Sequence, residues 1–144
     1  MPFERSFFSG GANDMRAWQA RNLGAGAFKG PRKFDQIGDI KLGANLESRF
    51  EFIGVFEGAA FIDAGNIWLT HEDPARPGAK FELNKFYNEI ALDAGLGLRL
   101  NYNYFILRLD AAIPITNPAE DSGNRWVVQK TSFNNVSHIN AVME

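Results

Sequence analysis

The residue with the clearest chemical potential in this sequence is Arg16, in the glycine-bounded stretch GGANDMRAWQARNLGAG at residues 10–26. A guanidinium withdrawn from water needs a carboxylate, preferably one that accepts two of its N–H groups, because burial of an unpaired charge is costly. Candidate partners are Glu47 and Asp63, which fall on the polar faces of two alternating segments. From the residues alone, the simpler interpretation is an exposed arginine unrelated to these acids.

Other patterns do not predict catalysis, a cofactor or a metal. Glycines 24, 26 and 30 form no Gly-x-Gly-x-x-Gly or Walker pattern after a strand. Residues 63–66 lack the ligand spacing of a calcium loop, His71 and His138 lie far apart, and no nucleophile has a recognisable base nearby. We therefore predict a protein that is not an enzyme and has no cofactor or metal.

Charged residues on the alternating segments could be catalytic pairs, but we interpret them as a solvated lining of mutually compensating charges. These residues are Lys41, Arg49, Glu51, Glu57, Asp93, Arg99, Arg108 and Asp110.

Composition narrows the class of protein. The 144 residues carry a formal net charge of −2 with 22% charged residues, which gives no basic footprint for nucleic acid. A hydrophobic fraction of 45% argues against disorder, and the absence of cysteine excludes a disulfide scaffold. No apolar run reaches the roughly 18 residues of a membrane helix, and residues 1–11 lack the order of a signal peptide.

The elements that must position these residues are long segments with a period of two. Residues 38–53 alternate strictly, residues 54–69 less strictly, and residues 88–104 alternate again before the phase flips. The flip indicates a tight hairpin around Asn103. Alternation over much more than the usual 5–6 residues or so predicts an all-β antiparallel meander of long strands.

Two architectures fit such strands: a soluble sandwich or ligand-binding barrel with apolar residues inside, and an outer-membrane barrel with apolar residues facing lipid. The segments exceed the roughly 9–11 residues needed to cross a bilayer, and their polar faces mix both charge signs with glycine. Aromatic residues near strand ends would form an interfacial girdle. These are Trp68, Tyr102, Tyr104 and Phe105. The periodicity favours the membrane barrel.

Four segments, in order, resemble the C-terminal half of the barrel in the BamA/TamA superfamily, the bacterial surface antigen family of outer-membrane assembly proteins. They are RSFFSGGANDMRAWQARNLGAG, GDIKLGANLESRFEF, AAFIDAGNIWL and IALDAGLGLRLNYNYFILRLDAAIPI. The first resembles the family's sixth extracellular loop, whose signature is an apolar residue, Arg, a small residue and an aromatic. The segment RAWQARNLGAG most resembles the corresponding loop of TamA-like members, including the TamL variant.

The resemblance implies a 16-stranded transmembrane barrel in intact members, located in the bacterial outer membrane of Gram-negative cells. It implies that the barrel inserts or helps translocate other outer-membrane proteins. Partners would be membrane lipids, client outer-membrane proteins and periplasmic assembly partners reached through upstream domains. It also implies that the loop folds into the lumen, so that Arg16 and its neighbour Trp18 form a latch with Glu47 and Asp63.

The resemblance also predicts the organisation of the chain. Residues 1–118 would be the C-terminal barrel segment with the arginine-bearing loop at 9–37, and residues 119–144 a degenerate final strand and tail. Ala17 replaces the family's usual glycine, and the upstream POTRA domains and first part of the barrel are absent from this sequence, which therefore resembles a fragment. A two-partner secretion transporter, which shares the arginine loop, and a soluble β-sandwich or ligand-binding barrel remain the alternatives.

Overall fold

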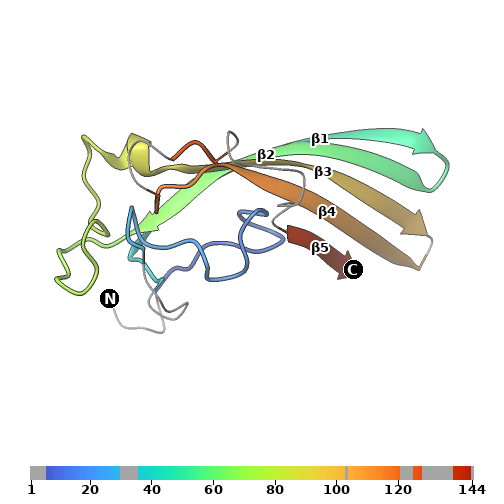
Figure 1. Ribbon diagram of the computed structural model, residues 1–144. Helices are drawn as coiled ribbons and strands as arrows, with labels where there is room; N and C mark the ends of the chain where they lie inside the picture. The colour runs from blue at the N-terminus through green and yellow to red at the C-terminus, as the bar shows by residue number, and fades with distance from the viewer. Residues whose placement is uncertain (1–5, 30–35, 103, 121–124, 128–137, 144) are drawn as a thin grey trace.

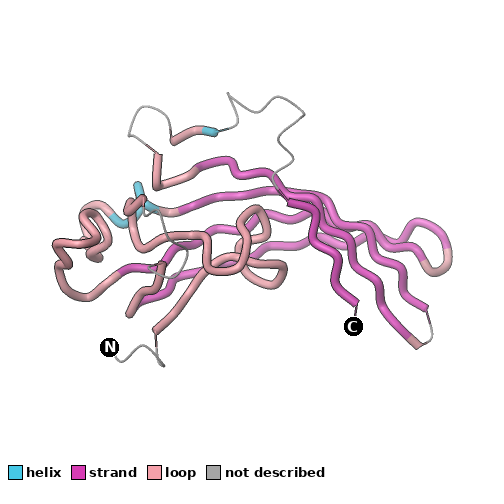
Figure 2. The backbone as a smooth tube through the Cα atoms, turned by 60° about the horizontal axis from the view of Figure 1, so that its bottom comes forward, coloured by secondary structure: helices cyan, strands magenta, loops and turns pink. Residues whose placement is uncertain are grey.

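The fold is a single antiparallel meander. The computed structural model describes residues 6–29, 36–102, 104–120, 125–127 and 138–143. Five strands follow one another in sheet order, which confirms the all-β fold class (Figures 1 and 2). They are β1 (Ile40–Ile53), β2 (Phe56–Trp68), β3 (Ala91–Tyr102), β4 (Phe105–Thr116) and β5 (His138–Met143), and the 3-10 turn η3 (Phe86–Glu89) precedes β3. None of the helices in the described part of the chain is long and apolar enough to cross a membrane.

Connections are short at one end of the sheet and long at the other. Only residues 54–55 join β1 to β2, and Gly54 takes the left-handed φ of 59° that this tight turn needs. Tyr102 pairs directly with Phe105, so the β3–β4 hairpin is equally tight, although Asn103 itself lies outside the described residues. Residues 69–90 connect β2 to β3 at the opposite end, where the chain also leaves β4 after Thr116.

The apolar face of the sheet is exposed and the polar face is covered, which is the reverse of the arrangement in a soluble protein. Apolar side chains of the alternating pattern point outward and are exposed, including Leu46 at 73% and Leu96 at 67%. Three acidic side chains of the other face are covered, with Asp63 and Asp93 at 0% and Asp110 at 1%, whereas Glu51 near the β1–β2 turn is exposed. A soluble sandwich would bury the first set and expose the second. This inverted arrangement is typical of a barrel wall that meets lipid outside and a polar interior inside.

The cover on the polar face is the segment at residues 6–29, which runs beneath the sheet in Figure 1. Its apolar residues pack in two clusters with residues of the strands and of the β2–β3 connection. The first contains Met15, Ala17, Trp18, Leu23, Phe61, Ala91 and Ala112. The second contains Ala25, Phe28, Ile67, Leu69 and Ala79. The core therefore lies between this loop and the polar face of the sheet.

The prediction of an aromatic girdle is wrong for one of its residues, Trp68. Tyr102 and Tyr104 are exposed at the short-turn end, at 52% and 92%, as interfacial residues would be. Trp68 at the other end is fully buried, because its indole packs edge-on against Phe81, with ring centroids 5.5 Å apart, and donates to Glu89. Trp68 is thus a core residue beneath the long β2–β3 connection. The side chain of Phe105 lies outside the described set.

Candidate functional site

A compact reversal of the loop brings Arg16 to the sheet. Gly10 and Gly11 adopt φ values of 103° and 108°, and the Asp14 carboxylate accepts hydrogen bonds from Ser9 Oγ and the Gly10 amide, both at 2.8 Å. Lys41 Nζ on β1 donates to the same carboxylate at 2.9 Å. A side chain at Gly10 would collide with the carbonyl of Gln19, so this glycine is required by space as well as by φ.

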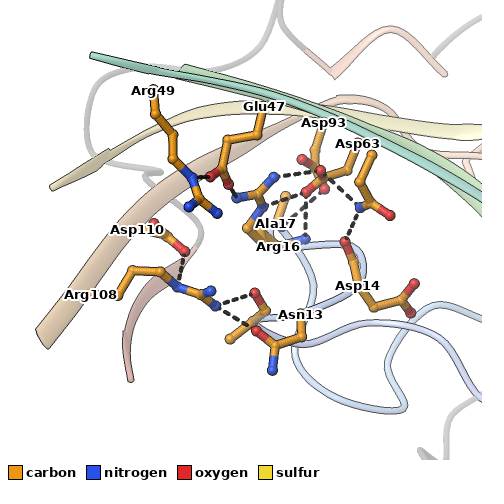
Figure 3. Close-up of polar contacts among 12 residues, drawn as sticks. Asn13, Asp14, Arg16, Ala17, Glu47, Arg49, Asp63, Asp93, Arg108 and Asp110 are labelled. Carbon is orange, nitrogen blue, oxygen red and sulfur yellow. Dashed lines mark hydrogen bonds and ion pairs between the residues drawn. The ribbon is translucent and has the colours of Figure 1, made fainter. Parts of the chain in front are cut away.

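Arg16 forms a two-pronged ion pair with Asp63 (Figure 3). Its Nε donates to Asp63 Oδ2 and its Nη2 to Asp63 Oδ1, both at 2.8 Å, while Nη1 donates to Glu47 Oε2 at 2.6 Å. The guanidinium carbon also lies 3.4 Å from the centroid of the Phe61 ring. Arg16 is only 5% exposed, so these contacts replace its water almost completely. The structure therefore brings together Arg16, Glu47 and Asp63.

The protonation of Arg16 follows from these contacts. Burial alone would lower the pKa of Arg16, but the hydrogen bonds that Arg16 donates to Asp63 and Glu47 outweigh burial and hold the pKa above its ordinary value. The guanidinium is therefore charged at any physiological pH. Loss of either partner would leave part of that charge uncompensated in a covered site.

Strand register explains why the acids meet at one place. Asn45 on β1, Asp63 on β2 and Asp93 on β3 lie directly opposite one another in the sheet. Asn45 Nδ2 donates to Asp63 Oδ1 at 2.9 Å and to the Asp14 carbonyl at 2.8 Å. The Ala17 amide donates to Asp93 Oδ2 at 3.1 Å. The loop thus supplies a guanidinium to one acid of the row and a backbone N–H to the next.

Glu47 extends the site toward the short-turn end. Besides Arg16 it accepts hydrogen bonds at Oε1 from Arg49 Nε at 2.6 Å and from Arg99 Nη2 at 2.7 Å. One carboxylate therefore serves three guanidiniums. On β4, Arg108 donates to the Ala12 carbonyl at 2.8 Å and pairs with Asp110 at 2.9 Å, which fixes the loop from the far side.

Trp18 packs in the apolar core and takes no part in the ion pairs. It is 7% exposed and belongs to the apolar cluster with Met15, Leu23 and Phe61. Its amide donates to the Met15 carbonyl at 3.1 Å, and its carbonyl accepts from the Gly11 amide at 2.8 Å, which closes the reversal that carries Arg16. The aromatic residue of the motif therefore anchors the loop, while the arginine makes the charged contacts.

Asp93 and Phe61 belong to the site but were not predicted as part of it. We expected Asp93 to be one of many lining charges, whereas it receives the loop backbone directly. A signal was present: Asp-Ala-Gly occurs at both 63–65 and 93–95, at corresponding positions of neighbouring strands. The sequence does not predict the position of Phe61 beneath the guanidinium. An aromatic residue on the polar face only interrupts the alternation and indicates no partner.

The contacts of this site attach the loop to the sheet. It holds no nucleophile paired with a base, and within the described ranges no group of three or more His, Asp or Glu side chains could hold a metal ion. Truncating one partner of a covered ion pair typically costs about 3–5 kcal/mol, since the other charge is left buried. The arrangement can therefore fix a long loop against a barrel wall and stabilise both.

A long-stranded sheet that exposes its apolar face and covers its polar face with its own loop defines a segment of an outer-membrane type of barrel. A family model described as the Omp85 superfamily domain matches residues 1–133, and the chain belongs to this superfamily. No curated protein and no solved structure matches the chain. Membership confirms the resemblance to the BamA/TamA superfamily at that level. Omp85 domains are found in outer-membrane protein assembly and translocation barrels, and they imply an outer-membrane location in bacteria.

Proposed function

We propose that this chain forms the C-terminal strands of an outer-membrane barrel that helps insert or translocate other outer-membrane proteins, in the manner of TamA/TamL-like members. The observation that carries the proposal is the loop arginine Arg16, held on Asp63 and Glu47 at the polar face of the sheet. Residues 15–18 have the order expected for the family's loop, which is an apolar residue, Arg, a small residue and an aromatic residue. Arg16, Trp18, Glu47 and Asp63 act as a structural latch, with no catalytic step.

The proposed orientation follows from connection length. Outer-membrane barrels have short periplasmic turns and longer extracellular loops. The turn at residues 54–55 would therefore face the periplasm, and residues 69–90 the outside. The exposed apolar face of β1 to β4 contacts lipid, and the arginine loop enters the lumen from the extracellular side.

The mechanism we propose depends on a sheet edge. An unpaired strand presents a row of N–H and C=O groups to which a client strand can pair. The sheet has β1 and β5 at its two edges, and β5 is short, at His138–Met143. We assign residues 1–118 to the barrel wall and residues 119–144 to a weakly specified seam region. The latch would keep the wall rigid while the seam opens, and periplasmic partners would deliver clients through upstream domains.

The test is reconstitution of the full-length protein into lipid vesicles, with insertion of an unfolded client barrel as the readout. We expect Arg16→Ala to slow insertion at least several-fold, and Asp63→Asn to reproduce part of the loss. Arg21→Ala is the matched control, since Arg21 is an exposed arginine of the same loop that lies over the Phe8 ring. Insertion rates unchanged in Arg16→Ala would refute the latch. Export of one dedicated substrate without client insertion would indicate a two-partner secretion transporter instead.

A further inference from the structure

A pocket lies on the outward face of the sheet, on the opposite side from the latch. Its volume is about 450 Å³. Its floor crosses three strands, where Ala64, Leu92 and Thr116 are in register as neighbours on β2, β3 and β4. Residues from the η3 turn and from the segment after β4 form its rim, and both segments lie at the long-connection end of the sheet (Figure 1).

The rim of this pocket combines two exposed aromatic rings with one cation. Tyr87 is 60% exposed and Trp126 is 61% exposed, and both line the opening. Arg125 lines the same pocket. Tyr and Trp are enriched where a membrane protein passes from the apolar core to the headgroup layer, because one end of each ring system is apolar and the other polar.

Arg125 is held in place without a carboxylate. Its Nη1 donates to the Asn88 carbonyl at 2.9 Å and its Nε to the Glu120 carbonyl at 3.4 Å. Among the described residues, no acid forms a salt bridge with it. Glu89, which follows Asn88, accepts the Trp68 indole N–H at 2.7 Å and lies near enough to Arg125 for the two charges to interact, but forms no salt bridge with it. The guanidinium is therefore positioned by backbone carbonyls, with its positive charge available to an anion at the pocket.

The height of the pocket matches a membrane interface. From Phe56 at the short-turn end to Ala64, a strand rising about 3.3 Å per residue and tilted by about 40° climbs roughly 20 Å along the membrane normal. The apolar band of such barrels is about 25 Å tall. The floor of the pocket thus lies near the outer edge of that band, where the headgroups of the outer leaflet begin.

We propose that this pocket binds an anionic lipid of the outer leaflet, with acyl-chain carbons on the Ala64–Leu92 floor and a phosphate at Arg125. The proposal rests on the outer-membrane placement given above. A basic side chain near a membrane surface favours an anionic lipid by a factor of about five. Because the site is on the lipid-facing wall, it would hold one lipid beside β3 and β4, the strands nearest to the short β5 edge.

The test uses Trp126 as the reporter in the full-length protein, in phosphatidylcholine vesicles that carry a small fraction of brominated lipid. The other tryptophans of this chain, Trp18 and Trp68, are buried, and subtracting the signal of Trp126→Phe isolates Trp126. We expect brominated phosphatidylglycerol to quench Trp126 about fivefold more effectively than brominated phosphatidylcholine.

Variants of the protein distinguish lipid binding at this pocket from a general attraction of anionic lipid to the protein surface. Arg125→Gln should abolish the preference, and Arg125→Lys should retain part of it. Lys85→Gln is the matched control, because Lys85 is an exposed cation of the same long connection outside this pocket, paired with Glu82 at 2.8 Å. Equal quenching by the two lipids, or a preference that persists in Arg125→Gln, would overturn the lipid site while leaving the membrane placement intact. Quenching by neither lipid would overturn both.

Discussion

Asp63 and Asp93 lie directly opposite each other on β2 and β3, and neither residue is exposed to solvent. Like charges facing each other across two strands destabilise a sheet. The loop acts on the two acids differently, because Asp63 accepts hydrogen bonds from the Arg16 guanidinium and Asp93 accepts one from the Ala17 amide. The loop and the sheet are therefore interdependent, because the acid row without the loop would lose the guanidinium on Asp63 and the backbone N–H donor to Asp93.

This asymmetry predicts opposite effects of neutralising the two acids. Asp93→Asn removes the like charge and keeps an oxygen for the Ala17 amide, so we expect the full-length protein to gain about 1 kcal/mol in free energy of unfolding. Asp63→Asn should lose stability, because Arg16 keeps only one charged partner. Thermal unfolding in detergent measures both. Equal destabilisation by the two variants would contradict the asymmetric assignment.

Glu47 should matter more than any one of the surface charges around it. Glu47→Gln leaves Arg16, Arg49 and Arg99 without their shared carboxylate, and we expect a loss of about 2–3 kcal/mol. Arg49→Gln serves as the control, since the Arg49 side chain is 60% exposed and an exposed pair contributes at most about 1 kcal/mol. Denaturant midpoints compared at constant m-value give the ranking. Similar losses in both variants would mean that Glu47 is not the hub of the network.

Ala17 should tolerate only small replacements. It is 3% exposed and its amide is bonded to Asp93, so Ala17→Gly keeps the hydrogen bond at a cost of about 0.5–1 kcal/mol in chain entropy. Ala17→Leu must displace the loop or its neighbours and should cost about 1–3 kcal/mol or more. Limited proteolysis of the loop would report the displacement directly. A leucine variant as protease-resistant as the parent would show that the loop is packed more loosely than the contacts indicate.

A pH dependence is expected at the end of the sheet where Trp68 is buried. Burial raises the pKa of Glu89 above its ordinary value, although the Trp68 indole donates to it and Arg125 lies near enough to oppose the shift. Because the folded-state pKa exceeds the unfolded one, this contribution to stability is fully present below the unfolded pKa. It is lost as pH rises through the folded pKa.

Glu89→Gln should therefore flatten the stability profile across that window, measured by unfolding of the parent and variant at matched pH values. The other charged groups that act on Glu89 are Glu82 and Lys85, and both are unchanged in the variant. Parallel profiles for the parent and Glu89→Gln would rule out Glu89 as the titrating group.

Much of the fold follows from alternation in the sequence, and the reasons for the exceptions are physical. The period of two predicts β1 to β4 and the polarity of each face, because a strand fixes side-chain direction residue by residue. The prediction is wrong for Trp68, because its burial depends on the β2–β3 connection at residues 69–90. The alternation of the strands does not predict the path of that connection. The final segment lacks alternation in sequence, yet His138–Met143 pairs with β4 through backbone bonds that do not require it.

The candidate site was predictable in part. Periodicity alone placed Glu47 and Asp63 on polar faces but left Arg16 as an ordinary surface arginine; only the family resemblance connected the three. The third acid of the row required the register of β2 against β3, which places Asp63 opposite Asp93. Register depends on the turn and on the partner strand, so a single strand sequence cannot supply it.

A double-mutant cycle between Arg16 and Asp63 tests the central claim most directly, with the free energy of unfolding of the full-length protein as the readout. If the two side chains are bonded as described, Arg16→Met and Asp63→Asn should each be costly, and their combination should cost little more than one alone. The predicted coupling energy is about 2–3 kcal/mol. Additive effects, with a coupling below about 0.5 kcal/mol, would contradict a loop latched to the barrel wall through this pair.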